Sequence, residues 1–270
     1  MSQQPTTLAS IRRYPVKSMM GEELNAVAIT ERGVAGDRAY SLVDLETDKL
    51  VNAKHPQKWP EMFAYRAQYV APPASQMDIP PVYITLPNGE VIESTSNSVE
   101  DKLSGALGKR VSLIRPSGSD KGFEGFVPTV EGVSDHDFVF DKISPPGTFF
   151  DIGLVHILTT STLNALKQVV PASSRIESRR FRPNLVIHTD GAEGFVENAW
   201  VGRTLRIGEV VLRVKQPTQR CVMTTLAQGD LPKDMAILKA IYRNNGGHIG
   251  VYADIVETGT VRVNDRVELI

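Results

Sequence analysis

Short runs in which apolar and polar residues alternate recur along much of the chain, and this spacing predicts strands with one buried face. Three such runs, rich in β-branched and aromatic residues, cover residues 7–14, 39–43 and 82–86. Turn residues with an apolar run on each side predict three antiparallel hairpins, with their turns at 87–90, 208–209 and 264–266. We therefore expect a mainly β fold of the α+β class, built from antiparallel sheet or barrel rather than a Rossmann fold.

Helical spacing of apolar residues replaces this alternation in three stretches, at residues 99–107, 163–170 and 235–245. In the first, Val99, Leu103 and Leu107 fall on one stripe between Ser98, a capping residue, and Gly108, a terminating one. The hydroxyl residues 159–162 precede the second stretch. We expect these few helices to lie at the periphery of the sheets.

Two loop segments, residues 71–74 and 117–122, are rich in proline, glycine or serine and are linker candidates. The second divides the chain into parts of comparable size. We predict a strand-rich N-terminal domain over residues 1–118 and a second, barrel-like domain over residues 119–270.

Composition narrows the function classes without naming one. The 270 residues carry a net charge of −1, which gives no global electrostatic footprint for a nucleic acid. No apolar run approaches the length of a membrane helix, and the first residues lack the pattern of a secretory signal. With one cysteine, an internal disulfide and a CxxC zinc site are excluded, and the five histidines have no metal-ligand spacing. We expect a cytoplasmic protein that is monomeric and has no nucleic-acid or membrane partner.

The single cysteine, Cys221, is the first candidate for chemistry. A lone cysteine is commonly a small buried apolar residue. Here it follows the predicted 205–214 hairpin and stands beside Arg220, whose charge favours the thiolate form. A thiolate at a strand end can attack an electrophile or bind a soft metal.

Cationic and hydroxyl residues form a second candidate group, for an anion. Lys17 and Ser18 follow a predicted strand, Arg38 precedes another, and Arg182 belongs to an arginine cluster around Phe181. Together with the free N–H groups expected at the 159–162 helix start, they indicate a phosphate site if they converge in space. Taken singly, each is as well explained as a solvated surface charge.

Other catalytic signatures are absent from the sequence. It holds no P-loop, no GxGxxG after a strand and no GxSxG elbow. A cysteine hydrolase would need a histidine near Cys221. His156 alternates with apolar residues and is either a core histidine or one at the edge of a site.

Six motifs in this order resemble the MOSC family, named for the carboxy-terminal domain of molybdenum cofactor sulfurase, in the two-part form found in the mitochondrial amidoxime reducing component and its bacterial relatives. They are YPVKS (14–18), GDR (36–38), VHILTT (155–160), FRPN (181–184), RCVMTT (220–225) and GVYA (250–253). The resemblance covers nearly the whole chain. It implies an N-terminal β-barrel domain followed by the MOSC domain.

The resemblance also implies a molybdenum cofactor, molybdenum held by a molybdopterin dithiolene, with Cys221 as the protein ligand to the metal. Arg220 would lie nearest the substrate. The remaining residues that it places at the pterin or its phosphate are Lys17, Ser18, Arg38, Asp151, Thr159, Thr160, Arg182, Asn184 and Tyr252. For Thr159, Thr160 and Tyr252, capping and packing remain the alternative.

By the same resemblance, the chain would be an oxidoreductase that reduces small N-hydroxylated compounds with electrons from a separate flavin or iron–sulfur reductase. Two alternatives stay open: a carrier of sulfur or of the cofactor that uses Cys221 without redox turnover, and a binding module that has lost the metal. Gln219 departs from relatives with a small hydroxyl residue there. Pyridoxal phosphate is associated with the family only, and we expect no pyridoxal-phosphate domain and no ferredoxin extension in this chain.

Overall fold

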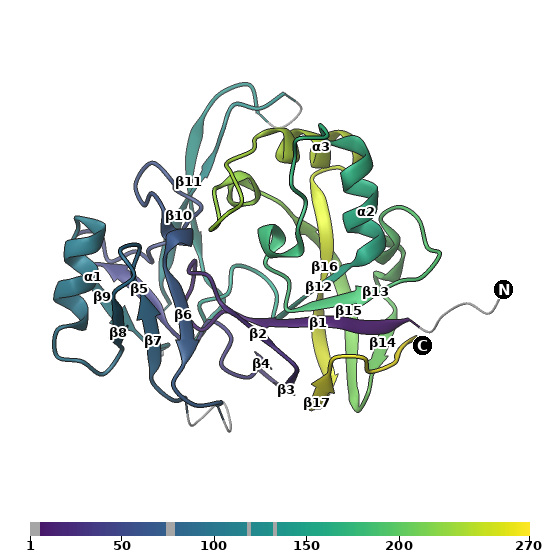
Figure 1. The fold of residues 1–270 in the computed structure, drawn as a ribbon, viewed down its shortest axis with the longest axis horizontal. Coiled ribbons are helices and arrows are strands. Elements are labelled where there is room, and N and C mark those ends of the chain that lie inside the picture. The colour runs from purple at the N-terminus through teal and green to yellow at the C-terminus, as the bar shows by residue number, and fades with distance from the viewer. Residues whose placement is uncertain (1–5, 74–78, 118–119, 132–133) are drawn as a thin grey trace.

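The largest element of the computed structural model is an eight-stranded sheet, which spans both ends of the chain (Figure 1). The model describes residues 6–73, 79–117, 120–131 and 134–270. In spatial order the strands of this sheet are β18 (Val267–Leu269), β14 (Thr204–Ile207), β15 (Val210–Gln219), β16 (His248–Glu257), β12 (Val155–Thr159), β13 (Leu185–His188), β1 (Thr7–Arg13) and β2 (Glu22–Leu24). The strand-rich α+β class predicted from the sequence is confirmed.

One pair in this sheet, β12 with β13, is parallel, whereas the other neighbours run antiparallel. The crossover between the two parallel strands contains the helix α2 (Thr160–Val169). All five residues of β12 are buried. This continuous burial is typical of a central strand covered on both faces.

The first strands of the chain pair with strands from its C-terminal half. On β1, Leu8 pairs with Ile187 and Ile11 with Leu185. A three-stranded sheet repeats the arrangement, with β3 (Ala26–Thr30) between β4 (Gly33–Val34) and β17 (Gly259–Arg262). The predicted boundary at residues 118 and 119 lies outside the described residues, and the division into 1–118 and 119–270 stays a prediction.

The remaining N-terminal strands form two small sheets around an aromatic core. They are β5 (Ser41–Asp44) paired with β9 (Val111–Ile114), and β6 (Arg66–Tyr69), β7 (Val82–Thr85) and β8 (Val91–Glu93) in that order. Trp59, Phe63 and Tyr65 are buried there, beside the short 3-10 helix η1 (Met62–Ala64) and under α1 (Val99–Leu107).

The predicted hairpins 82–92 and 205–214 are confirmed as β7–β8 and β14–β15. The third predicted hairpin is wrong, because β17 pairs with β3 and β18 pairs with β14. Leu8 of β1 explains this outcome: its N–H donates to the carbonyl of Asp265 and its own carbonyl accepts from the N–H of Asn264. A distant strand therefore occupies the hydrogen-bonding groups of the predicted turn.

The three predicted helices are present as α1, α2 and α3 (Ala236–Asn245). Gly108 and Gly246 end α1 and α3 in the left-handed conformation that glycine adopts without strain. Three further 3-10 turns are η2 (Ser178–Phe181), η3 (Val196–Trp200) and η4 (Val222–Thr225). In the described part of the chain, no helix has the length and apolar character needed to cross a membrane.

A two-stranded hairpin, β10 (Gly122–Val127) with β11 (Phe138–Ile143), projects beside α3 in Figure 1. Phe138 and Val139 near its tip and Ile143 at its base are exposed. Its base is anchored by Phe123, which is fully buried against Leu50 and Phe149.

Candidate functional site

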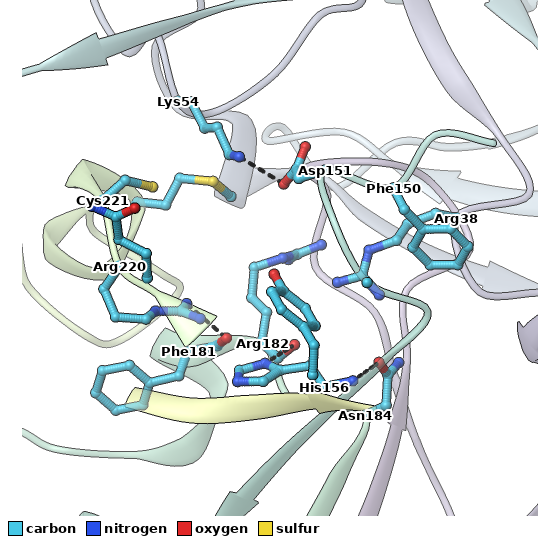
Figure 2. Close-up of a pocket in the computed structure, with 14 residues that line it drawn as sticks. Arg38, Lys54, Phe150, Asp151, His156, Phe181, Arg182, Asn184, Arg220 and Cys221 are labelled. Atoms are coloured by element: carbon cyan, nitrogen blue, oxygen red, sulfur yellow. Dashed lines mark hydrogen bonds and ion pairs between the residues drawn. The ribbon is translucent and has the colours of Figure 1, made fainter. Parts of the chain in front are cut away.

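A polar cavity of about 70 Å³ lies where the N-terminal and C-terminal segments meet. Its walls are formed by Arg38, Lys54, Phe150, Asp151, Gly153, His156, Phe181, Arg182, Asn184, Gln219, Arg220, Cys221, Met223 and Tyr252. In Figure 2, Cys221 and Arg220 lie on one side, and Arg38 and Phe150 lie opposite. The structure thus brings together Cys221 and five of the nine predicted cofactor-binding residues: Arg38, Asp151, Arg182, Asn184 and Tyr252.

Cys221 lies directly between the end of β15 and the start of η4. Its backbone carbonyl accepts hydrogen bonds from the N–H and the hydroxyl of Thr224, which hold the turn in place. The residue is half-buried and its thiol is free. The local strand–turn arrangement predicted around Cys221 is confirmed.

Arg182 is a buried cation with no acidic partner among the described residues. One guanidinium nitrogen, Nη1, donates to the carbonyl of Met19 at 2.8 Å, and the guanidinium stacks on the ring of Tyr14, 4.1 Å from its centroid. The other terminal nitrogen, Nη2, is buried without a hydrogen-bond partner. Burial lowers the pKa of Arg182 to about 10, so it stays charged at pH 7.

Arg220 also has a buried guanidinium nitrogen without a hydrogen-bond partner. Its Nη2 donates to the carbonyl of Phe181 at 2.8 Å, while its Nε is buried with no partner. Burial lowers the pKa of this guanidinium, since the charged form is the one that loses hydration. An anionic oxygen in the cavity would satisfy both arginines.

Arg38 differs because it has a carboxylate partner, Asp37. Asp37 also accepts hydrogen bonds from the N–H of Tyr14 at 2.7 Å and from the side-chain amide of Asn184 at 3.0 Å. Burial is the largest single influence and opposes the charge of Arg38, but Asp37 together with Tyr14 and Asp151 outweighs burial and raises the pKa of Arg38. Asp37 therefore fixes Arg38 and Asn184 at the cavity wall.

Asp151 bridges two buried lysines. Its carboxylate lies 2.6 Å from Nζ of Lys17 and 2.8 Å from Nζ of Lys54. Burial would raise the pKa of Asp151, yet the two lysines hold it well below its usual range. Lys17 also donates to the carbonyl of Phe149, and burial lowers the pKa of Lys17 to about 8. Lys17 thus supports Asp151 from behind the wall and does not itself line the cavity.

His156 and Tyr252 form the floor of the cavity, with ring centroids 5.6 Å apart. The ring nitrogens of His156 lie 3.3 Å from the carbonyls of Arg182 and Ile249. Burial, helped by the charge of Arg220, lowers the pKa of His156 to about 3, so the ring is neutral at pH 7. This places His156 at the edge of the site, the second of its two predicted positions.

Besides Lys17, three predicted residues lie outside the cavity lining: Ser18, Thr159 and Thr160. The Ser18 hydroxyl accepts from the N–H of Ala53 at 3.1 Å. Thr159 caps α2, and its hydroxyl donates to the buried Glu197 at 2.7 Å. The carboxylate of Glu197 thus occupies the helix start where a phosphate was predicted, and we assign Thr159 to capping in place of an anion contact. The hydroxyl of Thr160 accepts from the N–H of Thr189.

The sequence reasoning missed Lys54, Phe150 and Met223, which line the cavity. Lys54 and Phe150 belong to no motif that marks them in advance, whereas Met223 lies inside the RCVMTT motif, whose cysteine and arginine alone were singled out. Lys54 reaches the site through its ion pair with Asp151. A different signal is visible only in the backbone. Of the six non-glycine residues with positive φ in the described chain, three are predicted site residues: Ser18 (63°), Arg38 (50°) and Arg182 (54°). Such strained positions cluster at functional sites.

Two family models match long regions of this chain. A model of the MOSC domain matches residues 149–268, and a model of the MOSC N-terminal beta barrel domain matches residues 5–108. This chain belongs to the MOSC family. The resemblance read from the sequence is therefore confirmed, and the cavity combines side chains from both matched regions.

Among solved structures, this MOSC protein is similar to the YuaD protein from Bacillus subtilis, with 11% identity and a TM-score of 0.49 over 99% of this chain and 97% of that one. YiiM from Geobacillus stearothermophilus and YiiM from Escherichia coli each show 18% identity and a TM-score of 0.34, over 44% of this chain and 54% of theirs. No curated protein matches the chain.

The MOSC cavity suits an anion with a thiophilic metal. Arg38, Lys54, Arg182 and Arg220 line it against one carboxylate, Asp151, and two of the arginines have orphaned buried nitrogens. Cys221 supplies one soft ligand. Among the described residues, no three histidine, cysteine, aspartate or glutamate side chains gather to hold an ion.

Proposed function

We propose that this MOSC protein binds the molybdenum cofactor in the polar cavity and reduces small N-hydroxylated compounds with electrons from a separate flavin or iron–sulfur reductase. The observation that carries the proposal is the convergence of the Cys221 thiol with Arg38, Arg182 and Arg220 around one cavity.

Each residue has a task in this proposal. Arg182 and Arg220 would offer their unpartnered nitrogens to the phosphate and the other anionic groups of the pterin. Arg38, held by Asp37, would bind the same group from the opposite wall. The Cys221 thiolate would bind molybdenum, whose other ligands come with the cofactor.

The reaction balances with two electrons and two protons. The N–O bond of the hydroxylated nitrogen breaks, the oxygen leaves as water, and the nitrogen is released as an amine or amidine. The cofactor, when bound, supplies the two-electron redox chemistry. The surrounding side chains bind, orient and screen the substrate, and Arg220, next to Cys221, is the side chain nearest to it.

The test begins with loading. The wild-type protein and three variants, Cys221→Ala, Arg182→Gln and Arg175→Gln, are purified from a host that makes the cofactor. Arg175 is a control because it is an exposed arginine paired with Glu177 and Asp230, outside the cavity. Molybdenum is measured by elemental analysis and the pterin by fluorescence after oxidation.

We expect equimolar molybdenum and pterin in the wild type and in Arg175→Gln. Arg182→Gln should lower pterin occupancy about tenfold or more, because a charge-assisted hydrogen bond in a buried site is lost. Cys221→Ala should fold normally and lose turnover of an amidoxime with an artificial electron donor. Wild type without pterin, when a known molybdoenzyme loads in the same host, would contradict cofactor binding.

A second outcome separates the enzyme from a carrier. A wild type that holds the cofactor but reduces no N-hydroxylated compound, while passing molybdenum or sulfur to an acceptor through Cys221, would replace the oxidoreductase by the carrier.

A further inference from the structure

A second, largely apolar cavity of about 330 Å³ adjoins the polar one. The two share Lys54, Gln219, Arg220 and Cys221 in their walls. Cys221 therefore stands at the junction of a cationic cavity and an apolar one. We call the latter the hairpin cavity, because the β10–β11 hairpin forms one wall and Leu238 and Tyr242 of α3 form another.

One face of the hairpin supplies most of the side chains that the hairpin contributes to this cavity. Phe138, Phe140 and Lys142 alternate along β11 and line it, as does Val127, the cross-strand partner of Phe138. Phe126, from the opposite face of β10, also lines it. Gly125 lies opposite Phe140, and a Cβ at Gly125 would overlap the Phe140 ring. The absence of a side chain at Gly125 thus lets this ring lie flat on the strand.

The other face of the hairpin fixes its position. Glu124 forms ion pairs of 3.0 Å with both Lys49 and Lys58, and Asp141 pairs with Lys49 at 2.6 Å. The two lysines belong to the N-terminal segment. The aromatic wall is therefore held against Cys221 by a network of charges, which favours a rigid binding surface.

The charged side chains in the described lining of the hairpin cavity are all basic. Lys54, Lys142 and Arg220 line it, and no acidic side chain does so among the described residues. Lys54 is neutralised in part by Asp151, whereas Lys142 has no acidic partner in the described chain. Burial, with the repulsion of Lys54, lowers the pKa of Lys142. An anionic group on a bound molecule would relieve that repulsion.

We propose that the hairpin cavity is the substrate-binding site and that it selects aromatic compounds carrying a carboxylate or similar anionic group. The aromatic body would pack between Phe140 and Tyr242, the anionic group would pair with Lys142, and the reducible group would face Cys221. The placement of the reducible group at Cys221 rests on the proposed function. The hairpin lies within residues 109–148, between the two matched family regions.

Binding is tested without turnover, by calorimetric titration of the purified full-length protein with benzoate, benzamide and acetate. Benzoate and benzamide share shape but not charge, whereas benzoate and acetate share charge but not the ring. We expect benzoate to bind about fivefold more tightly than benzamide, the effect of one partly exposed ion pair. Acetate should bind more weakly than benzoate.

Two variants separate the contributions. Lys142→Gln should abolish the preference for benzoate over benzamide, and Phe140→Leu should weaken both aromatic ligands about fivefold through loss of the ring contact. Their matched controls are Lys121→Gln, an ion-paired lysine at the start of the hairpin, and Val139→Ala, on its opposite face. Thermal unfolding of each variant verifies that it is folded.

Two results would overturn the assignment. One is equal binding of benzoate and benzamide, or a preference that survives Lys142→Gln. The other is benzoate binding that disappears in Arg182→Gln and persists in Phe140→Leu, which would put the ligand in the polar cavity. Neither readout needs molybdenum, so a failure of cofactor loading refutes the proposed function and leaves this result standing.

Discussion

Replacing Asp151 by Asn should destabilise the protein by more than any exposed ion pair would. Asp151 bridges Nζ of Lys17 at 2.6 Å and Nζ of Lys54 at 2.8 Å, and both lysines are largely buried. Removing one partner of a buried ion pair costs about 3 to 5 kcal/mol, because the remaining charge is left unpaired. The side chain of Asp151 is 28% exposed, so water screens part of this effect. We expect a loss of about 2 to 3 kcal/mol in the free energy of unfolding at pH 7.

Urea unfolding measures this loss, with Asp141→Asn as control. The control removes a carboxylate from an ion pair with Lys49, but its side chain is 71% exposed, and it should cost less than about 1 kcal/mol. A double-mutant cycle with Lys17→Met then isolates the pair. In the Lys17→Met background, Asp151→Asn should cost at least about 1 kcal/mol less. Equal losses in Asp151→Asn and Asp141→Asn would refute the argument.

The pH dependence of this loss has a definite sign. Because Lys17 and Lys54 hold the pKa of Asp151 below its usual range, its contribution is complete above the unfolded value of about 3.9. It disappears as the pH falls through the lower folded pKa. The gap in stability between wild type and Asp151→Asn should thus stay constant from pH 7 to about pH 5 and narrow only in stronger acid.

Two further predictions concern residues that support the polar cavity from behind its lining. Gly250→Ala should cost about 2 to 4 kcal/mol in unfolding free energy, because Gly250 has φ +80° and a Cβ there would overlap the His156 ring and the carbonyl oxygen of Ile157. Gly89→Ala, with φ +87° and open space around it, should cost only the strain of the left-handed backbone, and equal losses in the two variants would exclude these overlaps as the cause. Lys17 has its pKa lowered by burial to about 8, so the unfolded chain binds more protons between pH 8 and 10.5 and stability rises with pH there. The wild type should gain about 1.5 kcal/mol relative to Lys17→Met between pH 8 and 9.5 in urea unfolding, and parallel curves would contradict the shift.

Local signals in the sequence were sufficient for elements whose partners are close along the chain. Helix α1 was predicted with its bounds because its stripe of Val99 and Leu103 and the terminating Gly108 act within a few residues. The β7–β8 and β14–β15 hairpins follow for the same reason. The hairpin predicted around residues 264–266 is wrong because Leu8, from the other end of the chain, forms backbone hydrogen bonds with Asn264 and Asp265. Pairings at such separation leave no periodic trace.

The residues of the candidate site also divide into those that local motifs predict and those that only contacts distant in sequence reveal. Arg38, Arg182 and Cys221 were identified because they belong to short motifs that resemble a family. Lys54 belongs to none of them, and its role depends on Asp151, which is distant in sequence. The start of α2 was recognised as an anion site on local grounds, but the anion is the chain's own Glu197. Local chemistry can predict that a carboxylate or phosphate is favoured there, and only the fold decides which one is present.

The polar cavity depends on β1 as much as on the MOSC region that holds Cys221. Asp37 accepts from Tyr14, at the end of β1, from Asn184, before β13, and from Arg38. The ring of Tyr14 in turn lies between the guanidinium groups of Arg38 and Arg182, at 5.0 Å and 4.1 Å from its centroid. β1 pairs with β13 in the large sheet. This pairing brings Tyr14 and Asn184 to Asp37, and so it also positions the two guanidinium groups. Arg38 and Arg182 both have a left-handed backbone conformation, and these contacts with Tyr14 hold their side chains. Such strained positions persist where the surrounding structure fixes them.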